Sequence, residues 1–221
     1  MALSGAEGFG SSRAAIAARW NSQLKTVIYI RKRYPTDANY VVFRPIAEGI
    51  SRAWVGMKGA AQLVRISFAG AARLVATANK SRAGSADVAG VITHEMGHMI
   101  GLLHEHQRPD RNSYVKVDWE NVEGNGASDC DGTLKNRYGD FCTDSDYGNP
   151  RDRRCLPCQH DFLGKAVGKY DYDSIMHYFR YHAAKDESKP TITALRDPNK
   201  PLGWCKTPSD GDLDAVRYLY K

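Results

Sequence analysis

Five residues within positions 91–111 have the types and spacing of a metal-dependent hydrolytic site. The pattern H-E-x-x-H-x-x-G-x-x-H is matched by His94, Glu95, His98, Gly101 and His104. Residues of a helix turn by about 100° each, so His94 and His98 share one face and can reach the same ion. Three neutral imidazoles leave one position for water, which is typical of a catalytic zinc ion. The motif therefore predicts one Zn²⁺, with His94, His98 and His104 as its ligands.

The other two residues of the motif have separate predicted roles. Glu95 directly follows the first ligand and lies near the open coordination position, where we expect it to act as general base. Gly101 allows the chain to leave the helix in a conformation that a residue with a Cβ resists, so that His104 can return to the ion. The alternative, a His-rich surface helix or a set of hydrogen-bonded core histidines, fits five residues at fixed spacing poorly.

The residues around the motif predict a central helix. Between positions 85 and 103, apolar side chains cover much of the helix circumference: Val88, Val91, Ile92, Met96, Met99 and Ile100. We therefore expect this helix to pack on most of its sides.

The residues before the motif predict a lobe of strands and helices. We expect a flexible lead over residues 1–13, with the folded part beginning at Arg19 and Trp20. Residues 26–30, 63–68 and 73–78 are predicted as strands, with a turn at 35–37 and a polar loop at 79–84. A helix is predicted after Pro45, from the helical spacing of Ile46, Ile50, Ala53 and Trp54.

The residues after the motif predict a lobe with little regular structure. Residues 114–117 are a short strand at best, and a long cysteine-rich loop follows at 123–161. Ser209 and Asp212 form a capping-box-like start for a final helix, whose packing face is Leu213, Val216, Leu219 and Tyr220. We expect a single catalytic domain over residues 1–221, with a lead at 1–19, an N-terminal lobe at about 20–104 and a C-terminal lobe at about 105–221.

The cysteines favour disulfides but leave other states open. One C-x-x-C pair and two scattered cysteines match a four-cysteine zinc knuckle poorly; the five cysteines are Cys130, Cys142, Cys155, Cys158 and Cys205. Disulfides would hold the polar loop and imply an oxidising compartment, whereas a second structural metal or free thiols are the alternatives. The pairing is not predicted.

Composition and charge exclude several classes of partner. The net charge is +6 and the isoelectric point is near 9.0, but the basic residues are dispersed. We expect no nucleic acid partner, because there is no nucleic-acid fold signature and no glycine-rich phosphate loop. The sequence has no apolar stretch of about 18 residues, so we predict no membrane-spanning helix. The first 20 residues lack the apolar segment of a signal peptide, so the chain is either cytosolic or begins after its signal.

The motif region resembles a known family. HEMGHMIGLLHEHQRPDRNSYV is similar to the astacin family of zinc endopeptidases, a branch of the metzincins, in which Glu105 follows the third histidine. YDYDSIMHY at 170–178 looks like that family's Met-turn, and VKVDWENV and SDGDLDAVRYLY are also similar. The resemblance is strong over residues 91–178, fair beyond them and weak before residue 85.

The resemblance implies roles for residues that would otherwise be assigned to core packing. Met176 would lie beneath the metal as a hydrophobic floor. Tyr178 would ligate zinc in the resting enzyme and swing away to stabilise the reacting carbonyl. Glu105 would anchor the amino group of the mature N-terminus. Because Trp20 resembles a tryptophan near that terminus, the mature chain would begin near the 13–14 junction.

The chain also departs from the family pattern. Family members usually carry cysteines in the N-terminal lobe, but none precedes Cys130. The propeptide motif F-x-G-D is absent, and the substrate-binding edge strand is placed at residues 73–78. The implied fold is α+β and metzincin-like, with a mixed sheet, helices and the zinc helix in the N-terminal lobe, and a mostly irregular C-terminal lobe that ends in a helix.

These observations predict a secreted, monomeric zinc endopeptidase that hydrolyses internal peptide bonds. A zinc-bound water would attack the carbonyl of a protein or peptide bound extended in the cleft, with Glu95 as general base and Tyr178 assisting. Arg180 and Lys185 would favour acidic side chains after the cut bond, although solvated surface charge is an equal alternative. The alternative function is a catalytically inactive zinc-binding interaction module of the same fold, and the alternative location is the cytoplasm.

Overall fold

The computed structural model describes residues 2–4, 10–24, 26–47, 49–79, 88–124, 138–143, 165–203 and 207–221. Its helices and strands are β1 (Ala2–Ser4), α1 (Gly10–Leu24), β2 (Arg31–Lys32), β3 (Tyr40–Ile46), β4 (Ala61–Ser67), α2 (Phe68–Ala78), α3 (Val88–Ile100), β5 (Val115–Val117), β6 (Ile192–Ala194) and α5 (Asp210–Leu219). Small sheets and separate helices make this an α+β fold, as predicted from the sequence.

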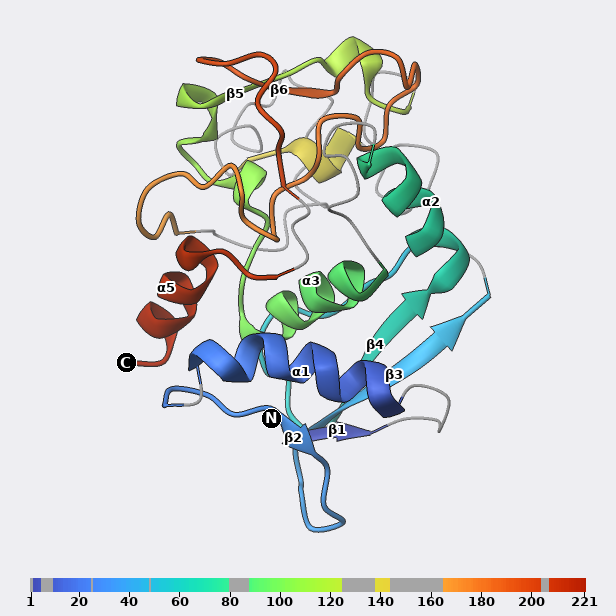
Figure 1. Cartoon of the computed structure of the whole chain (residues 1–221), viewed down its shortest axis with the longest axis vertical. Helices are drawn as coiled ribbons and strands as arrows, with labels where there is room; N and C mark the ends of the chain where they lie inside the picture. The colour runs from blue at the N-terminus through green and yellow to red at the C-terminus, as the bar shows by residue number, and fades with distance from the viewer. Residues whose placement is uncertain are drawn as a thin grey trace.

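The larger sheet has four parallel strands in the order β2-β1-β3-β4. β3 and β4 pair over seven residues, from Tyr40 opposite Ala61 to Ile46 opposite Ser67. Beyond β4, the sheet continues through one antiparallel bridge between Arg52 and Arg65. In Figure 1 this sheet and α1 lie in the lower half of the molecule, and α3 runs above them.

α3 is the central helix of the molecule. All of its residues from 90 to 100 are buried, so the prediction of a helix packed on most sides is confirmed. Trp20 of α1 is fully buried, and its Nε1 donates to the carbonyl of Thr93 at 3.3 Å. Val64 and Ile66 of β4 join the same core from the sheet. The sheet and α1 thereby fix the position of the motif helix.

The C-terminal part of the chain packs on the other side of α3. β5 and β6 form an antiparallel pair at the top of Figure 1, and a second apolar cluster surrounds Phe141, Tyr170 and Ile192. The predicted strand at 114–117 and final helix are both confirmed, and Ser209 and Asp212 form a complete capping box for α5. Little other regular structure is present in the described residues of this part.

The predicted strand at residues 26–30 is wrong, because a side chain takes the place of a strand partner. Residues 26–30 form a turn and irregular chain after α1, and only Arg31–Lys32 are in a strand. The Asn21 side chain accepts from the N–H of Ile30 at 2.8 Å and donates to its carbonyl at 2.6 Å. Ile30 is therefore buried without a β ladder.

The predicted helix after Pro45 is also wrong. Tyr40–Ile46 form β3, which buries Val41 and Phe43, and residues 49–60 have no helix. Pro45 is tolerated in the strand because the described part of β1 pairs only with residues 41 and 42, so one side of β3 is unpaired there. Trp54, expected on the buried helix face, is 60% exposed.

Residues 73–78, predicted as a strand and as the substrate-binding edge, belong instead to the helix α2 (Phe68–Ala78). Ser67 caps this helix, since its side chain accepts from the N–H of Gly70 at 3.0 Å. The positions 71, 74, 75 and 78 have helical spacing and form the buried or partly buried face. The edge of the sheet is therefore formed by β4 and the segment bridged to it at Arg52.

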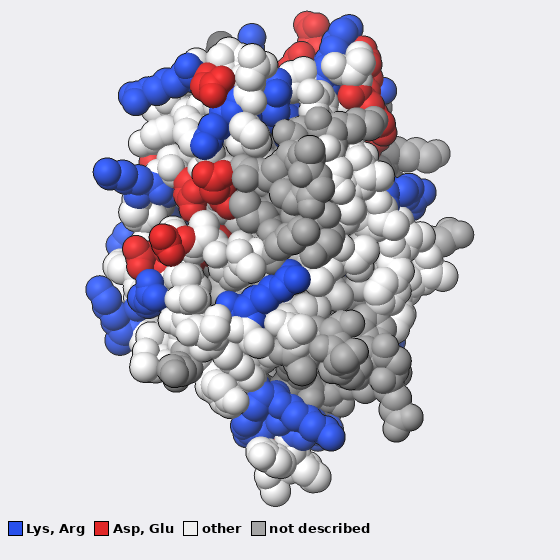
Figure 2. Space-filling view, viewed as in Figure 1, with Lys and Arg blue, Asp and Glu red and all other residues white. Residues whose placement is uncertain are grey.

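The predicted flexible lead is partly structured, since residues 2–4 form β1 and α1 begins at Gly10. Most of the predicted cysteine-rich loop, including Cys130, Cys155 and Cys158, lies outside the described residues, as does Cys205. None of the helices in the described part of the chain has the length and hydropathy needed to span a bilayer. Figure 2 shows Lys and Arg side chains in several separate places on one face.

Candidate metal centre and active site

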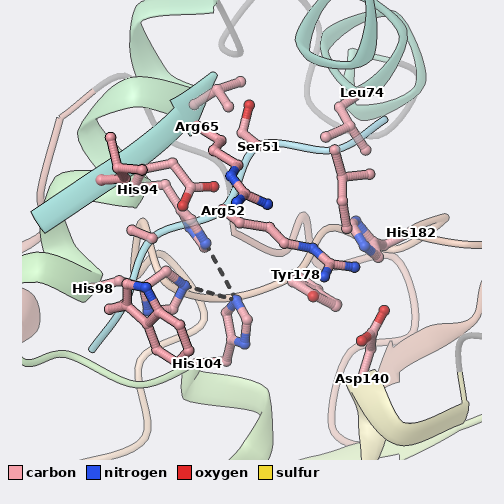
Figure 3. A pocket seen from close by; sticks show the side chains of 16 residues that line it. Ser51, Arg52, Arg65, Leu74, His94, His98, His104, Asp140, Tyr178 and His182 are labelled. Carbon is pink, nitrogen blue, oxygen red and sulfur yellow. Dashed lines mark hydrogen bonds between the residues drawn. The ribbon is translucent and has the colours of Figure 1, made fainter. Parts of the chain in front are cut away.

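The three predicted ligands converge on one point. The Nε2 atoms of His94 and His98 each lie 3.2 Å from Nε2 of His104. All three ligand atoms lie within 4.8 Å of one another, and Figure 3 shows the three rings pointing together. Nitrogen ligands placed tetrahedrally about 2.0–2.1 Å from zinc are about 3.3 Å apart. The spacing of these atoms fits a zinc ion.

The hydrogen bonds at Nδ1 of the three rings leave each Nε2 available to bind a metal ion. Nδ1 of His94 lies 2.7 Å from the Ile175 carbonyl, and Nδ1 of His98 lies 2.9 Å from the Leu102 carbonyl. Nδ1 of His104 lies 2.9 Å from Oε1 of Gln107. Because these oxygens accept, each Nδ1 carries the proton, and three Nε2 lone pairs face one another. A cation resolves that repulsion, so the donor set fits zinc.

Burial keeps the three imidazoles neutral, as metal ligands must be. It lowers the pKa of His94 to about 4 and that of His98 to about 3, and it also lowers the pKa of His104. Glu95, on the same helix, is 6% exposed. Burial raises the pKa of Glu95 to about 8, and the positive charge of Arg52 opposes this rise.

The chain reverses directly after α3 to return His104 to the first two ligands. Gly101 has a φ of +113°, in a region that residues with a Cβ avoid. The N–H of Gly101 donates to the His98 carbonyl at 2.9 Å, and that of Leu102 donates to the Gly97 carbonyl at 3.0 Å. These bonds satisfy two of the last four carbonyls of the helix and fix the path to His104.

Met176 packs against Gly97, which lies between the two ligands in the sequence of α3. It is 1% exposed, and a Cβ added at Gly97 would lie 2.5 Å from its sulfur. The backbone of this turn also contacts the metal site. The Ile175 carbonyl accepts from His94, and the Met176 carbonyl accepts from the N–H of Glu105 at 3.1 Å. Gly97 was not singled out from the sequence, although a glycine inside a helix costs about 1 kcal/mol and so signals close packing.

Asp212 of α5 supports the turn that contains Met176. Its carboxylate accepts from Ser174 Oγ at 2.6 Å and from the N–H of Ile175 at 2.9 Å, and Asp212 is 5% exposed. The same carboxylate accepts from the N–H of Ser209 at 2.9 Å as part of the capping box. One buried acid therefore connects the final helix, the turn and, through Ile175, the ligand His94.

Glu105 has partners within the folded chain. Its carboxylate accepts from Arg108 Nη1 at 3.0 Å and from the N–H of Asp171 at 2.8 Å. Burial raises the pKa of Glu105 to about 7, and both of these contacts oppose the rise. The expected contact with a mature amino terminus is not among these bonds, and the 13–14 junction lies inside α1.

Tyr178 lies beside the third ligand. Its ring centroid is 4.6 Å from that of His104, and the residue is 7% exposed. It lines an open pocket of about 530 Å³ together with the three ligands and Glu95. The other wall of this pocket is made by residues 50–54 and by Leu63 and Arg65 of β4.

Two arginines that sequence reasoning missed reach into this pocket (Figure 3). Arg52 and Arg65 are directly opposite each other in the antiparallel bridge, so their side chains lie on the same face. Both are exposed, and no ion pair is found for either within the described residues. Arg180 and Lys185, which were predicted to select acidic substrates, are not among the residues that line the pocket. Only the strand pairing, which the sequence prediction lacked, would have signalled Arg52 and Arg65.

Comparison with known proteins identifies the class. The model of the astacin peptidase family matches residues 10–149 and 159–221, so this chain belongs to the astacin family. The predicted family and its zinc cofactor are thereby confirmed, and the histidine triad is where that zinc fits.

Individual relatives agree with this assignment. The low choriolytic enzyme of Oryzias latipes is 37% identical over 131 residues, which are 59% of this chain and 38% of that protein. Zinc metalloproteinase nas-9 of Caenorhabditis elegans is 33% identical over 138 residues, 61% of this chain and 20% of that protein. This chain thus spans less than half the length of these curated relatives. The structure of high choriolytic enzyme 1, a hatching enzyme zinc-protease from Oryzias latipes, is also similar. The match covers 100% of this chain and 88% of that chain, with 23% identity and a TM-score of 0.67. It confirms the predicted metzincin-like fold.

Proposed function

We propose that this chain is a zinc-dependent endopeptidase that hydrolyses internal peptide bonds of a protein or peptide substrate. The observation that carries the proposal is the convergence of three imidazole Nε2 atoms in a pocket that Glu95 also lines. Zinc at this site supplies a Lewis acid that activates water and polarises a carbonyl. Membership of a peptidase family supports a peptide as the substrate.

We assign Glu95 the role of general base. It accepts a proton from the attacking water and passes that proton to the departing amine. A base must be ionised at neutral pH, and burial alone opposes ionisation of Glu95. The positive charge of Arg52 favours the carboxylate, as does any cation held by the neighbouring histidines.

We assign Tyr178 two roles: its oxygen would ligate the zinc ion in the resting enzyme, and its hydroxyl would then donate to the oxyanion that forms on the substrate. Its ring lies beside His104 and lines the pocket, which supports a hydroxyl within reach of the reacting carbonyl. Met176 acts as the apolar floor, supported by its burial against Gly97. Gly101 and Glu105 position the third ligand and the turn, as their backbone geometry and hydrogen bonds support.

An extended substrate would bind along residues 50–54 and not along residues 73–78. Arg52 uses both its N–H and its carbonyl to pair with Arg65, each at 2.9 Å. In an antiparallel pair, the residues on either side direct their backbone groups the opposite way. The backbone groups of Ser51 and Ala53 therefore face away from β4, and both residues line the pocket. A peptide strand can add to that edge.

We further propose a secreted, monomeric protein whose cysteine-rich loop is held by disulfides. Cys142 is buried and disulfide-bonded, which supports an oxidising compartment. Its pairing partner lies outside the described residues. Non-reducing mass mapping of the secreted protein tests the disulfides, and free thiols at all five cysteines would contradict them.

The decisive experiment compares Glu95→Gln with the wild type on casein and on a quenched fluorescent peptide. We expect Glu95→Gln to bind one zinc per chain but to lose at least about 100-fold in turnover, the usual scale for general-base loss. Glu120→Gln, an exposed residue outside the pocket, is the matched control and should retain activity. A chelator should abolish wild-type hydrolysis, and added zinc should restore it. No hydrolysis by the zinc-loaded wild type would instead support an inactive zinc-binding module.

A further inference from the structure

The ring of Tyr178 lies between two imidazoles. Its centroid is 4.0 Å from that of His106 and 3.7 Å from that of His182, and each pair of rings is inclined by only 25°. His106 is 0% exposed and His182 is 4% exposed. Both faces of the phenol are therefore covered by flat rings in a stacked arrangement.

The edges of the three-ring stack are bounded as well. Phe141 is fully buried and meets the Tyr178 ring edge-on, at 5.8 Å and 77° between the ring planes. The same phenyl lies 5.9 Å from His106 and 6.4 Å from His182. On another side lies the predicted ligand His104. The phenol thus has walls on both faces and a stop at one edge.

The imidazole of His106 and the backbone of His182 are anchored independently of Tyr178. Nε2 of His106 donates to the Asp140 carbonyl at 2.8 Å, and the carbonyl of His106 accepts from Arg111 at 3.2 Å. The N–H of His182 donates to the Phe179 carbonyl at 3.1 Å, and its carbonyl lies 2.8 Å from Thr191 Oγ1. The two walls are therefore held by the surrounding chain.

We propose that His182 is a positioning residue that forms, with His106, a slot confining the phenol of Tyr178 to movement within its own plane. This rests on the proposed role of Tyr178 at the metal centre. A ring stacked between two flat rings slides along them with its stacking largely kept, whereas tilting further out of the plane requires an imidazole to move. The slot therefore restricts the path of the hydroxyl and keeps the ring beside His104.

The first test removes one wall of the slot. His182→Ala deletes the ring, His182→Leu keeps most of the volume without a flat face, and His182→Phe restores a flat face. We expect His182→Ala and His182→Leu to lower kcat about tenfold with KM changed less than about threefold, because a positioned hydroxyl acts mainly in the transition state. His182→Phe should stay within about twofold of the wild type. Far-UV circular dichroism and zinc content verify that the variants are folded and loaded.

The second test does not depend on turnover. Copper(II) replaces zinc, and absorption spectra report the phenolate-to-copper charge-transfer band. The band should be present in the wild type and in His182→Phe, absent in Tyr178→Phe, and at least about twofold weaker in His182→Ala at equal copper content.

Three outcomes would overturn the slot: no band in the wild type, a wild-type kcat and band in His182→Ala and His182→Leu, or equal impairment of His182→Phe. A wild type with no peptide hydrolysis but a band that weakens in His182→Ala would refute the proposed function and leave the slot standing.

Discussion

The pocket at the metal centre has two sides, a buried wall and an exposed wall, which differ in burial and hydrogen bonding. The buried wall, which holds the histidines, is made of hydrogen-bonded groups: the imidazole Nδ1 atoms, the Met176 turn and Asp212. The exposed wall is residues 50–54, which β4 holds through the backbone bridge at Arg52 and through two side-chain contacts, Ser67 N–H to Ser51 Oγ at 3.2 Å and Gln62 Nε2 to the Trp54 carbonyl at 3.5 Å. Its side chains Arg52 and Trp54 are exposed. The buried wall is thus anchored by internal hydrogen bonds, whereas the edge proposed to bind substrate exposes its side chains.

This difference fits two separate functions, positioning of the metal ligands by the buried wall and recognition of a peptide by the exposed wall. Metal ligands and a general base must be held within a few tenths of an ångström, and buried hydrogen bonds provide that precision. Recognition of a peptide needs backbone groups and side chains that are accessible to it. We therefore expect substitutions in the buried wall to change metal binding, stability or turnover, and substitutions in the exposed wall to change mainly substrate preference, apart from the effect of Arg52 on Glu95.

Asp212→Ala should have the largest effect, because it removes support from the buried wall. Three donors lose their acceptor: Ser174 Oγ and the N–H groups of Ile175 and Ser209. The three unsatisfied donors, one of which is the Ser209 N–H of the capping box, together predict a destabilisation of about 3 kcal/mol, measured by urea unfolding. Zinc affinity should also fall, because Ile175 holds His94.

Asp214→Ala is the matched control for Asp212→Ala. Asp214 lies on the same helix, but its side chain is 71% exposed and pairs only with Arg217 among the described contacts. An exposed ion pair of this kind predicts a change below about 1 kcal/mol. Equal effects of the two substitutions on stability and zinc affinity would remove the proposed link from α5 to the metal centre.

Tyr178→Phe should have an intermediate effect. Loss of one hydroxyl that acts in the transition state predicts about a tenfold fall in kcat, or about 1.4 kcal/mol, with little change in KM or zinc content. Tyr181→Phe, a nearby residue that does not line the pocket, is the control. An unchanged kcat in Tyr178→Phe would leave this residue with a packing role alone.

The buried wall was also the part that the sequence predicted best. Three local patterns of the sequence were sufficient here: the ligand spacing, the glycine after the helix and the capping box. The structure contains the corresponding features, which are α3, the φ of +113° at Gly101 and the Ser209–Asp212 capping box. The partners Gly97 and His182 escaped prediction, because their importance depends on contacts with Met176 and Tyr178 that no local pattern reveals.

The N-terminal part was predicted poorly for a related reason. Residues 26–30 contain β-branched and aromatic side chains, but Asn21 satisfies the backbone of Ile30 where a strand would need a partner. Residues 73–78 were predicted as a strand, yet they continue a helix that begins at Phe68 and is capped by Ser67. Side-chain hydrogen bonds to the backbone therefore decided both segments, and local composition favoured the wrong element in each.

The smallest predicted effect concerns the exposed wall. The double substitution Arg52→Gln, Arg65→Gln should lower kcat/KM about threefold to tenfold for peptides with a Glu side chain relative to matched Gln peptides, because each exposed ion pair is worth about 1 kcal/mol or less. Both peptides meet the same Glu95, so the ratio cancels any effect of Arg52 on the pKa of Glu95. Added salt should reduce the preference. Arg44→Gln, exposed on β3 but outside the pocket lining, should leave the ratio unchanged. An equal loss on both peptides would show that the arginines hold the wall in place and do not select the substrate.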